Sequence, residues 1–75
     1  MKELVEHMAK SLVSNPEAVQ VAAVEEGDRL NLSLTVAAED MGKVIGKQGR
    51  IAKAMRVVLK AVATKEGIKC NLDID

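Results

Sequence analysis

The amino-acid sequence predicts an α+β domain in which three helices cover one face of a three-stranded mixed sheet. Hydrophobic residues recur at helical spacing in some segments and at strand spacing in others, in the order α-β-β-α-α-β. The chain has 75 residues, so residues 1–75 are expected to form a single domain. A composition of 48% hydrophobic and 29% charged residues is typical of globular proteins.

The first half of the chain predicts one helix followed by a β-hairpin. Apolar residues recur at helical spacing over 2–13, and Pro16 prevents this helix from continuing. Residues 18–25 favour a strand, although their alternation is imperfect. After a turn at 26–28, apolar and polar residues alternate over 30–36 with the period of a half-buried strand. The short connection between the two strands predicts the hairpin.

The second half predicts two helices and a last strand. Glu39 and Asp40 open a short helix that runs to about Ile45, since acids suit the positive end of the helix dipole. A second helix begins near residue 50, Gly67 ends it, and alternation over 68–74 predicts a strand. The expected core stripe of the second helix is Ile51, Ala54, Met55, Val58, Leu59 and Val62. A helical crossover between the last two strands predicts that they pair in parallel.

Composition excludes several classes of protein. No segment approaches the roughly 18 apolar residues of a membrane span, and residues 1–6 lack the basic start and apolar run of a signal peptide. One cysteine, Cys70, cannot form an internal disulfide, and no spacing matches a metal site or a catalytic constellation. We therefore expect a cytoplasmic protein that is not an enzyme and has no metal, no cofactor and no small-molecule substrate. The absence of aromatic residues also argues against RNA-binding sheets that stack bases on aromatic rings.

The charge is balanced overall but unevenly distributed. Residues 1–37 carry three bases against six acids, whereas residues 38–75 carry eight bases against five acids. Within 41–65 there are seven bases and no acid. Such a segment is a plausible surface for a polyanion, although a lysine-rich helix surface can also serve solubility alone.

The sequence Gly46-Lys47-Gln48-Gly49 separates the two predicted helices. Each glycine costs roughly 1 kcal/mol in a helix interior, so two glycines in four residues predict a break. A glycine loop lets a phosphodiester approach the backbone, and the amides that begin the next helix favour an anion. An ordinary helix–helix turn would explain the same residues. A nucleotide-binding P-loop does not fit, because the spacing differs and Gln48 replaces the hydroxyl residue after the lysine.

The segment DMGKVIGKQGRIAKA (residues 40–54), with a strand before it and an apolar-periodic helix after it, resembles the signature of a KH domain. The element order is similar to the type II, prokaryotic arrangement. The whole chain resembles the family of small bacterial KhpA (YlqC-like) RNA-binding proteins. The resemblance implies single-stranded RNA binding in which the GXXG loop clamps the backbone of about four nucleotides.

The resemblance implies roles for individual residues. Gly46 and Gly49 would let the sugar-phosphate pass close to the backbone, and Lys47 and Gln48 would contact phosphates. Ile45 would support an apolar groove floor with Ile51, for which a core position is an equal explanation. Electrostatic attraction would come from Lys43, Arg50 and Lys53. Arg56 and Lys60 lie further round the helix, where solvation alone explains them.

The last helix also predicts a protein-contact surface. Its apolar arc extends to Val57 and Ala61, wider than packing on one sheet requires, which makes these two residues a candidate dimer surface. The resemblance implies a homodimer, or a heterodimer with a larger Jag-like KH protein. It further implies work as an RNA chaperone or post-transcriptional regulator that affects bacterial cell elongation or division. The alternative function is a protein-interaction module whose GXXG loop is vestigial.

Overall fold

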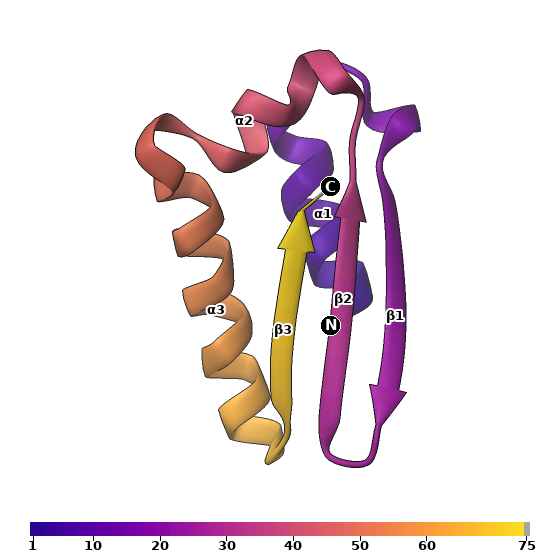
Figure 1. The fold of residues 1–75 in the computed structure, drawn as a ribbon, viewed down its shortest axis with the longest axis vertical. Helices are drawn as coiled ribbons and strands as arrows, with labels where there is room; N and C mark the ends of the chain where they lie inside the picture. The colour runs from indigo at the N-terminus through magenta and orange to yellow at the C-terminus, as the bar shows by residue number, and fades with distance from the viewer. Residues whose placement is uncertain (75) are drawn as a thin grey trace.

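The computed structural model describes residues 1–74 as a three-stranded sheet with three helices on one face, as the sequence predicted (Figure 1). Asp75, the last residue of the predicted domain, lies outside the described residues. The helices are α1 (Lys2–Leu12), α2 (Met41–Ile45) and α3 (Arg50–Glu66), and the strands are β1 (Gln20–Glu26), β2 (Arg29–Thr35) and β3 (Lys69–Ile74). Three short 3₁₀ turns, Pro16–Ala18, Ala38–Asp40 and Lys47–Gly49, connect these elements.

The sheet has the strand order β1-β2-β3 and confirms both predicted pairings. β1 and β2 form an antiparallel hairpin in which Glu26 pairs with Arg29 across a two-residue turn. Gly27 supports this turn because its φ of 62° is readily available only to glycine. β2 and β3 run parallel, with Leu32 opposite Leu72, and α2 and α3 form the crossover between them.

The core lies between the sheet and the helix layer. Strict alternation in β2 sends Leu30, Leu32 and Leu34 toward the helices and leaves Asn31 and Ser33 on the open face. β1 follows the pattern less well, since only Val21 of its seven residues is buried. α1 contacts β1 and α3 contacts β3. α3 runs beside β3 (Figure 1), which is the strand at the edge of the sheet.

The predicted core stripe of α3 was partly wrong. Met55 and Leu59 are buried as expected, but Ala54 and Val58 are exposed, and Ile51 and Val62 are half-buried. The structure buries two alanines instead, Ala52 and Ala63. The reason is that apolar residues cover about 240° of the helix circumference at 100° per residue, so periodicity alone does not fix the centre of the buried face.

Candidate nucleic-acid interface

The loop between α2 and α3 has a backbone that ordinary residues rarely adopt. Gly46, Gln48 and Gly49 have φ values of 77°, 58° and 72°. The turn is closed by a hydrogen bond from the Gly49 amide to the Gly46 carbonyl, with an N···O distance of 3.2 Å. Lys47 and Gln48 are exposed at its tip. The predicted GXXG segment is therefore a tight turn that presents two polar side chains to solvent.

The two glycines of the loop are required for different reasons. A Cβ on Gly46 would lie 2.6 Å from Cγ1 of Ile51, so this position has no space for a side chain. A Cβ on Gly49 would have no heavy atom within 4 Å, so only its positive φ favours glycine. Gly46 thus packs against Ile51 at the start of α3, whereas the space beside Gly49 is open to a ligand.

The N-terminus of α3 provides amide groups for an anion. The Arg50 amide donates to the Lys47 carbonyl of the preceding 3₁₀ turn, and the following amides of the first turn have no side-chain cap and no acid beside them. The helix dipole adds partial positive charge at this end. Arg50 and Lys53, both exposed in the first turn, add full positive charges beside the loop.

The sides of α3 differ in chemistry. At 100° per residue, Lys53, Arg56 and Lys60 lie on one flank of the helix, at one edge of the buried face. The exposed residues Ala54, Val57, Val58 and Ala61 form an apolar flank that begins beside Lys53 and has Arg50 and Lys65 within its arc. Val57 is 68% exposed and Ala61 is also exposed, so the residues predicted as a dimer surface are at the surface. One helix therefore presents a basic flank and an apolar flank in different directions.

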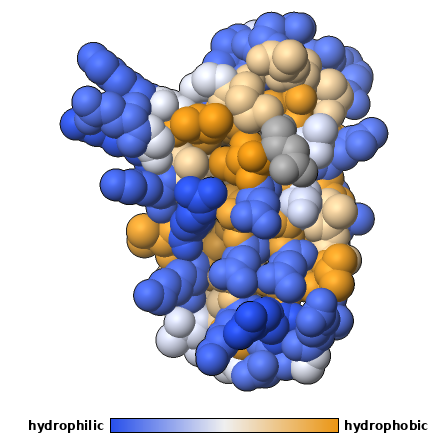
Figure 2. All heavy atoms as spheres, viewed as in Figure 1, coloured by the Kyte–Doolittle hydropathy of each residue, from blue (hydrophilic) through white to orange (hydrophobic). Residues whose placement is uncertain are grey.

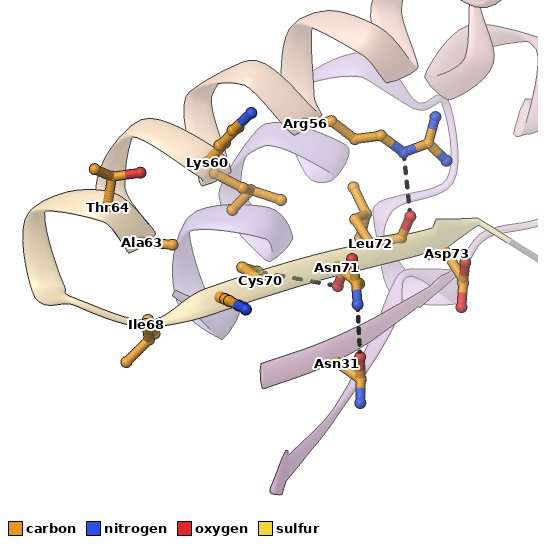
Figure 3. A pocket seen from close by; sticks show the side chains of 12 residues that line it. Asn31, Arg56, Lys60, Ala63, Thr64, Ile68, Cys70, Asn71, Leu72 and Asp73 are labelled. Atoms are coloured by element: carbon orange, nitrogen blue, oxygen red, sulfur yellow. Dashed lines mark hydrogen bonds between the residues drawn. The ribbon is translucent and has the colours of Figure 1, made fainter. Parts of the chain in front are cut away.

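A groove of about 620 Å³ lies between the basic flank of α3 and the edge strand β3 (Figure 3). Arg56, Lys60 and Thr64 line it from α3, and Asn71 and Asp73 line it from β3. Arg56 spans the gap, because its Nε donates a hydrogen bond to the Leu72 carbonyl with an N···O distance of 3.2 Å. Sequence reasoning assigned Arg56 and Lys60 to solvation alone. The signal that could have separated them from other surface bases is their helical spacing from Lys53.

Apolar residues reach the surface near the loop end of the molecule. Ile45, expected on the groove floor, is 36% exposed, and Ile51 is half-buried against the core. Figure 2 shows apolar side chains gathered between the loop end of α3 and the upper part of the strands, bordered by hydrophilic side chains. This arrangement suits a ligand with flat, partly apolar bases and a charged backbone.

Lys43 does not point at the loop. Its ammonium group lies 3.3 Å from Oδ1 of Asp40 and donates a hydrogen bond to the Ser14 hydroxyl. The side chain is about half exposed. The structure therefore joins Lys43 to the segment that follows α1, although the sequence suggested that it would add to the attraction for RNA.

Asp40 is a structural residue that sequence reasoning missed. Its carboxylate is fully buried and accepts hydrogen bonds from the amides of Ser14 and Asn15 at 3.1 Å and 3.0 Å. These bonds, led by that from Ser14, lower the pKa of Asp40 against the opposing effect of burial, and Lys43 lowers it further. Asp40 was expected to act on the dipole of its own helix, but it caps no amide there. No local pattern reveals a contact between residues 25 or more positions apart.

Within residues 1–74, no helix is long and apolar enough to cross a membrane. In the same range, no cluster of three or more histidine, cysteine or acidic side chains could hold a metal ion.

Comparison with known proteins identifies the family. Residues 2–74 match the family model described as KhpA/KhpB, KH domain. The RNA-binding protein KhpA of Clostridium perfringens is 60% identical over 74 residues, which cover 99% of each chain. The proteins of that name from Halalkalibacterium halodurans and Chlamydia trachomatis are 53% and 42% identical, over 99% of this chain and 97% and 95% of their own. These relatives belong to a family without enzymatic activity. The chain therefore belongs to the KhpA/KhpB family of KH domains.

Proposed function

We propose that this protein binds single-stranded RNA, with the GXXG loop and the N-terminus of α3 holding the phosphate backbone. The observation that carries the proposal is the position of an exposed, sharply turned loop directly before an uncapped helix N-terminus with no acid in its first turn. The relatives in the comparison are named RNA-binding proteins, which supports the same ligand.

The basic flank of α3 continues from this clamp along the groove. The backbone of RNA that follows the groove would pass Lys53 and then Lys60, while its bases face Arg56, β3 and the apolar surface near Ile45. About three neutralised phosphates give a slope of roughly −2 in a plot of log affinity against log salt concentration. Most of these contacts are to the backbone, so we expect weak binding with loose sequence preference.

The double variant Lys47→Asp, Gln48→Asp tests the clamp. Both side chains are exposed, so the fold should persist, which circular dichroism checks. The matched control, Lys2→Asp with Gln20→Asp, makes the same two exchanges at exposed positions on α1 and β1. In fluorescence anisotropy with a labelled single-stranded RNA pool, native and control proteins should bind in a salt-sensitive way and the loop variant should not. Equal binding by all three, or by none, would reject the clamp.

A second proposed activity is self-association through the apolar flank of α3. Val57 is 68% exposed and Val58 is 42% exposed, which is unusual for adjacent valines on a small protein. Ala54 and Ala61 extend this surface along the helix. Its partner would be a second copy or a larger Jag-like KH protein. Two clamps on one RNA would then raise the apparent affinity without new contacts.

Light scattering of a Val57→Glu variant tests this surface. The control is Val24→Glu, because Val24 is 54% exposed but lies on the open face of the sheet. Native protein and control should be dimers at high micromolar concentration, and the Val57 variant should be a monomer. A monomeric native protein would exclude a homodimer, and retained dimers of the Val57 variant would exclude this surface. If dimers form and neither native protein nor the loop variant binds RNA, the protein is an interaction module with a vestigial loop.

The cellular role is proposed from the same properties. A small module that holds RNA mainly by its backbone suits an RNA chaperone or post-transcriptional regulator, as the family resemblance implies. A cytoplasmic location and an effect on bacterial cell elongation or division remain predictions.

A further inference from the structure

The groove between α3 and β3 has the size and the lining of a site for a single nucleobase. Its volume of about 620 Å³ falls in the range of small-ligand sites, roughly 300–1,000 Å³. Leu59, Ala63 and Leu72 provide apolar lining, and polar groups of α3 and β3 line its sides. The following inference rests on the proposed RNA binding and concerns which bases this groove accepts.

The backbone of β3 alternates between β2 and the groove. The Lys69 amide donates to the Asp28 carbonyl at 2.8 Å, so Lys69 directs its backbone groups toward the hairpin. In a parallel pair the next residues alternate, and Cys70 and Leu72 therefore turn their backbone groups toward the open edge. At this edge, Nε of Arg56 donates a hydrogen bond to the Leu72 carbonyl.

This hydrogen bond fixes how Arg56 presents its remaining donors. A guanidinium group has five N–H donors in one plane, and Nε uses one of them on Leu72. Figure 3 shows Nε turned toward the Leu72 carbonyl and the two terminal nitrogens beyond it. The terminal edge thus offers two parallel donors, a geometry that fits two adjacent acceptors.

We propose that Arg56 is a specificity-determining residue that selects bases with two adjacent hydrogen-bond acceptors. Guanine offers O6 and N7, and cytosine offers O2 and N3. Adenine places its N6 amino donor beside each of its ring acceptors on these edges, and uracil places its N3–H donor between two carbonyls. The groove therefore prefers guanine or cytosine over adenine and uracil.

The test is fluorescence anisotropy with octauridine and three derivatives in which one central uridine is replaced by guanosine, cytidine or adenosine. Native protein should bind the guanosine or the cytidine derivative at least about 5-fold more tightly than the other two RNAs, the lower bound for a bidentate contact. Arg56→Lys keeps the charge but loses the planar fork. It should bind all four RNAs within about 2-fold of one another, near the native affinity for octauridine.

Arg29→Lys is the matched control, since Arg29 is an exposed arginine at the start of β2 and does not line the groove. The Arg29→Lys variant should keep the preference of the native protein among the four RNAs. Equal binding of all four RNAs by native protein, a preference for adenosine, or a preference that survives in Arg56→Lys would overturn the assignment. An equal loss of affinity for all four RNAs in Arg56→Lys would indicate that Arg56 contacts a phosphate, and it would also overturn the assignment. If native protein binds none of the RNAs, the proposed RNA binding fails together with this inference.

Discussion

Replacing Gly46 with alanine should destabilise the fold far more than the same change at Gly49. Gly46 has φ 77° and ψ 177°, a conformation that is essentially limited to glycine and costs other residues about 1–3 kcal/mol. The added methyl would also overlap Ile51, with contacts of 2.6 Å and 2.9 Å, and overpacking of this kind costs about 1–3 kcal/mol more. Together these terms give about 2–6 kcal/mol for Gly46→Ala.

Two further glycines serve as matched controls for this prediction. Gly49 is in the left-handed helical region with nothing near its Cβ position, so alanine should cost about 1–2 kcal/mol there. Gly42 lies in α2 with an open Cβ position, so alanine should stabilise the protein by about 0.5–1 kcal/mol.

Urea and thermal unfolding followed by far-UV circular dichroism measure these differences, since the chain has no aromatic residue for fluorescence. Each kcal/mol shifts the melting temperature of a domain this small by about 4–8 °C, so Gly46→Ala should lower it by at least about 8 °C. The order of stability should be Gly42→Ala, native, Gly49→Ala, Gly46→Ala. A Gly46 variant as stable as the Gly49 variant would refute the packing argument.

Two other predictions concern ionisable groups. The hydrogen bond from the Ser14 amide and the other contacts lower the pKa of Asp40 below its ordinary value of 3.8. The carboxylate should therefore stabilise the fold fully above pH 3.8, and this stabilisation should be lost as the pH falls through the lower pKa that Asp40 has in the folded protein. The stability gap between native protein and Asp40→Asn in urea should therefore narrow on acidification, and a constant gap would contradict this. Burial raises the pKa of the Cys70 thiol, so Cys70 should react with a disulfide reagent at pH 8 more slowly in the folded chain than in urea. Equal rates would show that the thiol is not protected.

The sequence was sufficient to predict the order of the elements because each signal is local. The alternation over 30–36 predicted both ends of β2 to within one residue, and the glycines at 46 and 49 predicted the break between α2 and α3. The crossover predicted the parallel pairing of β2 and β3, which the register confirms. The bounds of β1 were less accurate, since its mostly exposed residues do not alternate in burial.

The structural features that the sequence did not predict depend on contacts between segments that are distant in the sequence. Asp40 joins α2 to the end of α1 through two backbone amides, and this contact redirects Lys43 away from the loop. The groove depends on where α3 lies over β3, which decides that Arg56 faces the Leu72 carbonyl. α3 also buries Ala52 and Ala63, and a hydrophobicity pattern gives these small residues little weight.

The most direct test of the proposed interface is an NMR titration of the ¹⁵N-labelled protein with single-stranded RNA. The largest amide shifts should occur at residues 46–50, with further shifts at Lys53, Arg56 and β3 along the groove. They should weaken with added salt and stay small on the open face of the sheet around Val24. Shifts centred on the apolar flank of α3 or on the open sheet face, with none at the loop, would contradict the account.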